Sequence, residues 1–592
     1  MMKRFFTAML GSLAAIWISV GLIMILAVLF ITALIVRSNG GISAPAEIEK
    51  NSVLHIDLAT SVVEREGGND FESVILQQES NTVVLADLLN AIRKAAEDSK
   101  IEGIYLTGGG LSAGQAALND IAVALRDFKK SGKWIVAYAD NYTQGDYILS
   151  SGADELYVNP VGMVDVHGLS ASVTFYKGLL DKLGVEVQVI KVGTFKSAVE
   201  PYVLTSISDA NREQMDQFLS GIWGNFAGYM AESRDKKVED INNWADSMLL
   251  AADPASYVQN GVVDSLFYKH QVTERLMSLT GEDEEDDLKM VEMPAYIAHL
   301  EAKNLKLDKK GRHVAVLYAV GEISESGNSG ISSNSLVPQI NDLADDDDVA
   351  ALVLRVNSPG GSAFASEQIW EALQQFKAKG KPFYVSMGDY AASGGYYISC
   401  GADRIYASPV TLTGSIGIFG LIPNAKKLLN DHLGITESTV KTNLTGNFPS
   451  VTEPMTEYER SCMQAYVNRG YETFVGRCAE GRDMPVDSIK AIAEGRVWDG
   501  MTALKLNLVD ELGSLDDAIA AIAKKVGLHP GQFRCYPDTE PGIWDILAKA
   551  RGNIKAEVVR SYLGDNYEFI ERVNSISEMS TLQTRMPDIT LH

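Results

Sequence analysis

An internal repeat constrains the fold of this chain more than any other feature. The segment from Tyr138 to Asp154 matches the segment from Met387 to Asp403 at a constant spacing of 249 positions. The matched pairs include Asp140 with Asp389, Gly145 with Gly394, Asp154 with Asp403 and Pro160 with Pro409. Because so many matches at one offset do not arise by chance, the chain is predicted to be a tandem duplication.

Within each half, short apolar runs alternate with helical periodicity. Runs typical of buried parallel strands lie at 104–106, 134–137, 314–320, 350–356 and 382–387. Helices are predicted between them, over 116–128 and 366–376. In the second helix, Ile369, Leu373 and Phe376 fall on one face. This alternation predicts α/β domains built from βαβ units.

The length of the chain indicates more than one domain, and its net charge argues against one class of partner. The 592 residues are too many for one usual core. We predict an N-terminal end with a membrane anchor (1–37), a first repeat (51–300), a second repeat (310–541) and a tail (542–592) of unassigned role. The net charge of −25 repels phosphate backbones, so we expect no nucleic-acid partner. The 4 cysteines and 8 histidines show no C-x-x-C or H-E-x-x-H spacing, so we expect no metal and no cofactor.

The N-terminus predicts membrane attachment. Residues 5–36 carry no charge, and about 20 apolar residues are enough to span a bilayer. A cleavable signal peptide is the alternative, since residues 43–46 are small, but its apolar region is only about 7–15 residues long. We favour an uncleaved anchor. Lys3 and Arg4 precede the run, which predicts a cytoplasmic N-terminus and the rest of the chain across the membrane.

Two glycine-rich turns of the second half follow predicted strands. In the first, Gly360 and Gly361 lie within Asn357–Ser362 and can turn backbone N–H groups toward an oxyanion. In the second, Ser393 opens a helix with the Gly394 N–H beside its hydroxyl. A serine in this place is often only a helix cap. The pairing of a hydroxyl with free donors nevertheless suits acyl transfer.

A serine nucleophile needs a base. The candidates are Lys196, which lies among apolar residues, and His432, for which a surface role is the simpler interpretation. A lysine acts as a base only where burial lowers its pKa, and a surface lysine is the ordinary alternative. Gln144 of the first half stands at the position that matches Ser393. Residues 446–450 of the second half, which match the region around Lys196, include no lysine. Each half thus keeps one member of the pair, so neither half is expected to work alone.

A second serine motif is treated as a chance match. Gly110–Gly114, with Ser112 at its centre, fits the G-x-S-x-G pattern of a nucleophile elbow. The duplication, however, aligns it with the donor loop at Asn357–Ser362 rather than with the segment that contains Ser393.

Taken together, these segments resemble the signal peptide peptidase A (protease IV) family, in its long bacterial form. The members of this family are serine–lysine peptidases with a crotonase/Clp-protease type of fold. The resemblance covers nearly the whole chain. It is carried by N-S-P-G-G-S at Asn357–Ser362, A-A-S-G-G-Y-Y at Ala391–Tyr397, T-G-S-I-G at Thr413–Gly417 and F-K-S-A-V-E-P at Phe195–Pro201.

The resemblance implies specific roles for these residues. Ser393 would be the nucleophile, Lys196 the general base, and Ser415 the group that orients the lysine amine. The oxyanion donors would be Gly360, Gly361 and Gly394. It further implies degradation of released signal peptides, a homotetramer, and a single-pass protein of the bacterial inner membrane with its catalytic body on the periplasmic side.

Two other classes of function remain open at this point. One is a membrane-anchored scaffold that has lost its activity, because duplicated enzymes do lose sites. The other is an acyl-CoA enzyme of the crotonase type. The joint presence of Ser393 and Lys196 argues against the scaffold, and a body outside the cytosol argues against the CoA enzyme.

Overall fold

The computed structural model describes residues 48–65, 82–285, 288–304, 311–327, 330–537, 583–586 and 590–591. The predicted anchor at residues 5–36 lies outside this part of the chain. Among the helices that the structure describes, none has the length and apolar character needed to cross a membrane.

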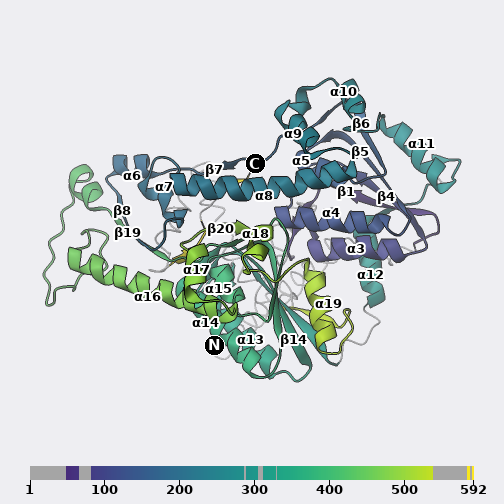
Figure 1. Ribbon diagram of the computed structural model, residues 1–592. Coiled ribbons are helices and arrows are strands. Elements are labelled where there is room, and N and C mark those ends of the chain that lie inside the picture. The colour runs from purple at the N-terminus through teal and green to yellow at the C-terminus, as the bar shows by residue number, and fades with distance from the viewer. Residues whose placement is uncertain are drawn as a thin grey trace, which may run out of the picture.

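A six-stranded parallel sheet forms the core of the first half (Figure 1). All its neighbouring strands pair in parallel. Helices α3 (Leu85–Glu97) and α4 (Gln115–Lys129) pack on one face, and α11 (Lys269–Thr280) packs on the other. In spatial order, the strands are β10 (Met290–Glu292), β1 (Ser52–Asp57), β4 (Ile101–Thr107), β5 (Trp134–Tyr142), β6 (Glu155–Val164) and β9 (Ser265–Leu266).

The second half repeats this arrangement. Its parallel neighbours are β11 (His313–Val320), β14 (Val349–Ser358), β16 (Phe383–Ala392) and β17 (Arg404–Ala407), in the same order as β1, β4, β5 and β6. Strand β22 (Phe533–Tyr536) lies outside β11, and β21 (Glu511–Leu512) lies outside β17. Strand β18 (Leu412–Gly414) also pairs with β16, and β20 (Val497–Asp499) lies outside β18. Each half also contains one helix of 25 residues, α8 (Asp209–Ser233) or α16 (Glu457–Gly481). The shared strand order confirms the predicted duplication and α/β class.

Strand β14 shows why the apolar runs form buried strands. Alternate side chains of a strand point to opposite faces of the sheet. Leu352 and Leu354 pack in one core with α14 (Ala363–Ala378), and Val353 packs in another core with α19 (Leu515–Lys525). Both faces of β14 are therefore covered, so nearly every residue must be apolar. The predicted helix face of Ile369, Leu373 and Phe376 is fully buried in α14.

A third sheet joins the two halves. Its strand β8 (Glu186–Lys191) belongs to the first half and pairs antiparallel with β19 (Phe419–Asn424) of the second half. Lys191 lies opposite Phe419, and Glu186 lies opposite Asn424. The other strands are β13 (Ile331–Ser332), β12 (Ile323–Ser324), β15 (Gly360–Ser362) and β23 (Gln583–Arg585). Because β8 pairs with a strand of the second half, the residues that follow β8 lie against the second half.

A buried ion pair also joins the halves. The guanidinium of Arg355, on β14, binds both carboxylate oxygens of Glu64 at 2.9 and 2.7 Å. The Arg355 side chain is only 2% exposed and that of Glu64 is 11% exposed. Beside this pair, the carboxylate of Asp389 accepts a hydrogen bond from the Ala116 N–H at the start of α4 (2.8 Å). Main-chain and side-chain contacts together fix the orientation of the two halves.

Replacing Glu64 by alanine is expected to lower the free energy of unfolding by about 3 kcal/mol, because Arg355 would remain charged and buried without its partner. Guanidinium titration of the purified protein measures this change. The matched control is Glu97→Ala, which removes an exposed partner of Lys94 and should change stability little. Equal losses in the two variants would contradict the role given to the buried pair.

Candidate active site

The structure brings Lys196 and Ser393 into contact although 197 positions separate them in the chain. The Lys196 Nζ lies 2.7 Å from the Ser393 Oγ. The Lys196 Nζ is also 3.1 Å from both the carbonyl oxygen and the Oγ of Ser415. All three residues are fully buried. The three side chains that the sequence motifs singled out therefore form one cluster.

Lys196 reaches this cluster because it follows strand β8, which belongs to the sheet between the halves. Beyond β8, the Val192 N–H donates to the Ile418 carbonyl (3.2 Å), and the Phe195 N–H donates to the Glu494 carbonyl (3.0 Å). Gly495 packs so closely that a Cβ there would lie 2.7 Å from the Lys196 Cα. These contacts hold the main chain that leads to Lys196.

Gln214 of α8 also holds the lysine-bearing segment, and no sequence motif pointed to it. Its amide Nε2 lies 3.3 Å from the Phe195 carbonyl oxygen and 3.1 Å from the Ser197 Oγ. Its amide oxygen accepts from the Val497 N–H of the second half (3.1 Å). Gln214 is 1% exposed. In the sequence Gln214 is one polar residue within a long helical stretch, and that signal is too common to assign a role.

Ser393 occupies a sharp turn between β16 and α15 (Gly394–Ser399). Its φ of 57° and ψ of −112° are unusual for a residue with a side chain. Its N–H donates to the Gly414 carbonyl (2.8 Å), which holds the turn against β18. The Ser393 side chain makes no capping hydrogen bond to its own helix. The alternative of a simple cap therefore does not describe this serine, whose hydroxyl contacts Lys196 instead.

The environment of Lys196 determines its protonation. Burial lowers the pKa of the Lys196 amine well below its ordinary value. Its hydrogen-bond partners are hydroxyl and carbonyl oxygens, and the Phe419 ring lies 6.0 Å from Nζ. None of these groups carries the negative charge that would stabilise an ammonium ion. The amine is thus suited to accept a proton.

The three candidate oxyanion glycines lie beside Ser393. Gly360 and Gly361 form β15 with φ values of 104° and 152°, which a side chain would strain. A Cβ on Gly360 would lie 2.8 Å from the Gly394 nitrogen, so these backbones are adjacent. The Gly360 N–H, however, already donates to the Ser358 Oγ (3.2 Å). Gly361 lies opposite Thr584 in the antiparallel pair with β23, whereas Gly394 begins helix α15 beside Ser393. The Gly394 N–H is therefore the candidate donor that these strand pairings do not involve.

The site also contains residues of the tail. Strand β23 pairs with β15, and Thr584 lies opposite Gly361. The Thr584 Oγ1 donates to the Gly361 carbonyl (3.1 Å), and Thr584 is fully buried. Sequence reasoning found no role for the tail, because a strand of three residues has no periodicity to detect.

Other candidates from the sequence lie elsewhere. His432 is exposed and packs against Gly184. Ser112 is also exposed, and its main chain bonds to Thr60 and Val62. Gln144 binds the turn at Gly168 through its side-chain amide (2.8 Å). These contacts hold loops in place and bring none of the three side chains to the Lys196–Ser393 pair.

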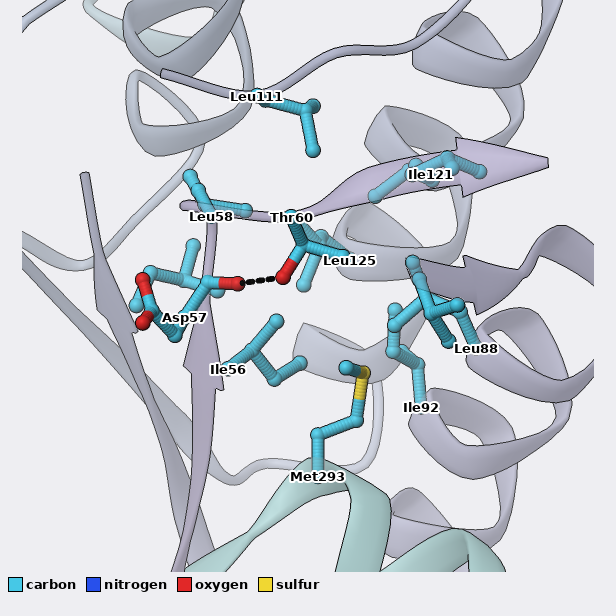
Figure 2. Close-up of a pocket in the computed structure, with 13 residues that line it drawn as sticks. Ile56, Asp57, Leu58, Thr60, Leu88, Ile92, Leu111, Ile121, Leu125 and Met293 are labelled. Atoms are coloured by element: carbon cyan, nitrogen blue, oxygen red, sulfur yellow. Dashed lines mark hydrogen bonds between the residues drawn. The ribbon is translucent and has the colours of Figure 1, made fainter. Parts of the chain in front are cut away.

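A separate apolar cavity lies in the core of the first half (Figure 2). Its volume is about 10 Å³, which matches about one water-sized sphere. Among its lining residues, the Thr60 hydroxyl donates to the Asp57 carbonyl (2.8 Å) and is thus already bonded. Aliphatic side chains and Met293 form most of the wall. This cavity is a packing defect and offers no chemistry.

Models of known families match both halves. The model of peptidase family S49 matches residues 127–282 and 375–529, which is more than half of the chain. The Clp protease model matches residues 319–411. The S49 model thus matches once in each half, as expected for a duplication, and the Clp protease model agrees with a Clp-protease-like fold.

Several curated relatives are similar over most of the chain. "Protease 4" from Salmonella typhi is 36% identical over 80% of this chain and 77% of its own length. "Protease 4" from Haemophilus influenzae is 35% identical over 73% of this chain and 71% of its own length. "Serine protease SPPA, chloroplastic" from Arabidopsis thaliana is 30% identical over 74% and 64%. The chain therefore belongs to peptidase family S49 and is a serine-type peptidase with tandem α/β repeats of Clp-protease type.

Proposed function

We propose that the chain is an endopeptidase in which Ser393 is the nucleophile and Lys196 the general base. The observation that carries this proposal is the 2.7 Å contact between the Lys196 Nζ and the Ser393 Oγ in a fully buried site. A neutral amine at hydrogen-bond distance from a hydroxyl is the arrangement that activates a serine.

The proposed reaction proceeds through an acyl-enzyme. The Ser393 Oγ attacks the carbonyl carbon of the substrate while its proton passes to the neutral Lys196 Nζ. The carbonyl electrons move to the oxygen and form a tetrahedral oxyanion. The Lys196 ammonium then protonates the leaving amine as the C–N bond breaks, which leaves an ester on Ser393. Water attacks this ester and gives a proton to Lys196. The Lys196 ammonium then returns a proton to the Ser393 Oγ as the ester C–O bond breaks, and the acid product leaves.

The supporting groups have distinct tasks. N–H groups of the glycine turns at Gly360, Gly361 and Gly394, foremost that of Gly394, stabilise the oxyanion. The Ser415 hydroxyl and carbonyl orient the Lys196 amine toward Ser393 from 3.1 Å. The hydrogen-bond partners of Lys196 are hydroxyl and carbonyl oxygens, which do not fix its amine in the charged form. The side chain can therefore gain and lose a proton without changing its position.

We propose released signal peptides and similar apolar peptides as substrates. The resemblance to signal peptide peptidases supports this choice. Residues 5–36 are proposed to anchor the chain in a bacterial inner membrane, with the catalytic body on the periplasmic side. This location would place the site where cleaved signal peptides remain after export.

We further propose a homotetramer. The segment 433–451 projects beyond α16 in Figure 1. It exposes large apolar side chains, and exposed apolar patches mark sites of protein contact. They are Leu433 (58% exposed), Ile435 (54%), Val440 (96%), Leu444 (72%) and Val451 (56%).

Changing Ser393 to alanine is expected to abolish peptidase activity while the protein stays folded, because the change removes only the attacking oxygen. A fluorophosphonate probe should label the wild-type protein at Ser393 and leave the variant unlabelled. Ser112→Ala is the matched control and should retain both activity and labelling. Near-normal turnover in Ser393→Ala would disprove the assignment. Absence of labelling in the wild type would favour an inactive scaffold or an acyl-CoA enzyme.

Lys196→Arg is expected to lower kcat/KM by a factor of roughly 10³, because guanidinium remains protonated and cannot accept the serine proton. Lys191→Arg, in the preceding strand, should keep activity. Substantial activity in Lys196→Arg would place the base elsewhere, and His432 would be the next residue to change.

The wild-type activity is expected to rise with pH as the Lys196 amine loses its proton. Because burial lowers the pKa of this amine, the rise should occur at lower pH than the titration of an ordinary lysine. A pH profile of kcat/KM measures this limb. An activity that falls with pH over the same range would contradict a lysine base.

Removal of residues 1–37 is expected to release the protein from the membrane fraction without loss of its catalytic site. Fractionation of cells that express the full or shortened chain measures the first effect. Light scattering of the shortened protein should give four times the mass of one chain. Retention of the shortened chain in the membrane would disprove the anchor, and a monomer mass would disprove the tetramer.

A further inference from the structure

A buried carboxylate lies shortly after Lys196 in the chain, and the proposed reaction does not use it. Glu200 is 3% exposed and begins α7 (Glu200–Val203), directly after a short helical turn at Ser197–Val199. Among the described residues, its carboxylate forms hydrogen bonds with Ser208 and Asn211 and no ion pair. Burial of a carboxylate costs free energy unless donors surround it, so these bonds need a reason.

Three donors face the Glu200 carboxylate. The Ser208 hydroxyl donates to Oε1 (2.5 Å), and the Ser208 N–H (3.4 Å) and the Asn211 Nδ2 (2.9 Å) donate to Oε2. An ionised carboxylate only accepts hydrogen bonds, so it determines which end of the Asn211 amide faces it. The Asn211 Oδ1 therefore points away from Glu200, and it accepts from the Gln214 Nε2 at 2.9 Å.

The Gln214 amide contacts the residues on both sides of Lys196. Its Nε2 lies 3.3 Å from the Phe195 carbonyl oxygen and 3.1 Å from the Ser197 Oγ. The main chain from Ser197 to Glu200 and the hydrogen bonds from Glu200 back to Ser197 thus form a closed ring. Asn211 and Gln214 are each 1% exposed, so water does not replace these bonds.

The same amide also holds the strand beside Ser415. Its oxygen accepts from the Val497 N–H (3.1 Å). Val497 lies opposite Gly414 in the pair of β18 with β20, and the Ser415 N–H donates to the Arg496 carbonyl (2.7 Å). A reversed amide would turn its oxygen toward a main-chain carbonyl and its NH₂ group toward a main-chain N–H, and both contacts would be repulsive. The orientation of this one amide therefore links the segments that carry Lys196 and Ser415.

Capping of helix α8 does not require this arrangement. In α16, Glu459 lies three positions after the cap residue Thr456 and accepts from the Thr456 N–H (2.8 Å). In α8, Asn211 lies three positions after the cap residue Ser208, and Glu200 accepts from the Ser208 N–H instead. A capping role explains the bonds to Ser208 but not the bond between Asn211 and Gln214.

We propose that Glu200 is a positioning residue for the general base. Its carboxylate orients the Asn211 amide, this amide orients Gln214, and Gln214 holds the main chain on both sides of Lys196. The inference rests on the proposed function, because it takes Lys196 as the base for Ser393. None of the hydrogen bonds of the Lys196 amine involves Glu200. Glu200 therefore affects the rate through the position of that amine.

Glu200→Leu removes the acceptor and leaves a side chain of similar size. It should lower kcat, and the rate of fluorophosphonate labelling at Ser393, by about tenfold, the effect expected from the loss of one buried hydrogen-bond partner. KM should change little. Glu200→Gln should keep kcat within about twofold of the wild type, because its amide oxygen can accept from Asn211 while its NH₂ group donates to the Ser208 Oγ.

Glu459→Leu is the matched control. It removes a carboxylate that is 6% exposed from the start of the corresponding helix of the second half. It should lower the melting temperature and leave kcat unchanged. Melting temperatures of all variants separate a loss of stability from a loss of rate. Wild-type kcat in Glu200→Leu, an equal loss of kcat in Glu459→Leu, or a Glu200→Gln variant as slow as Glu200→Leu would each overturn the inference.

Two combinations test the route through Asn211 and Gln214, and they apply even where Glu200→Leu does not fold. Asn211→Asp replaces the donor to Glu200 by a second carboxylate oxygen and should lower kcat. Glu200→Gln combined with Asn211→Asp restores one donor and one acceptor at this contact, so kcat should recover. Gln214→Met should lower kcat as Glu200→Leu does, and Glu200→Gln added to it should lower kcat no further. A combination as slow as Asn211→Asp alone, or a further loss in the Gln214→Met background, would contradict the proposed route.

Failure of this inference is distinguishable from failure of the proposed function. Activity in Ser393→Ala or Lys196→Arg would show that the nucleophile or the base is wrong, and the inference would fall with it. If both of these variants are inactive and Glu200→Leu keeps the wild-type kcat, only the positioning role of Glu200 is refuted.

Discussion

The antiparallel pairing of β8 with β19 is the contact on which the site depends. It hydrogen-bonds a strand of the first half to a strand of the second half over six matched pairs of residues. Five positions after β8 ends, the chain reaches Lys196. A side chain from one repeat is therefore delivered to a turn of the other repeat through main-chain bonds, which hold position more rigidly than surface contacts.

Two basic side chains, Arg355 and Lys196, are buried between the halves, and they have different kinds of partner. Arg355 cannot lose its proton, and it has Glu64 as a bidentate partner. Lys196 has only hydroxyl and carbonyl oxygens around its amine, so burial lowers its pKa instead. Burial therefore leaves Arg355 charged and paired, as a structural link between the halves. Burial of Lys196 instead favours its neutral form, which can accept a proton.

The first half has a loop and a helix equivalent to those of the second-half site, but their side chains make structural contacts. Its helix α5 (Gln144–Ser150) begins one repeat position earlier than α15 does in the second half, and it has a capping box between Thr143 and Asp146. The Asp146 carboxylate accepts from the N–H groups of Gly110 and Leu111, at the loop equivalent to the donor turn. The equivalent positions of the second half are Pro359, Gly360 and Gly395, so this carboxylate contact belongs to the first half.

The sequence by itself determined the duplication, the α/β class and the main strands, because apolar runs and matched spacings are local properties of the chain. It also singled out Lys196 and Ser393, through motifs and through what each half lacks; their catalytic roles remain a prediction. Only the tertiary structure decided the β8–β19 register, the hydrogen bonds of Gln214 to the lysine-bearing segment and the place of Thr584 beside the glycine turns. These features join residues hundreds of positions apart through short strands and single side chains, and such contacts leave no periodic pattern in the sequence.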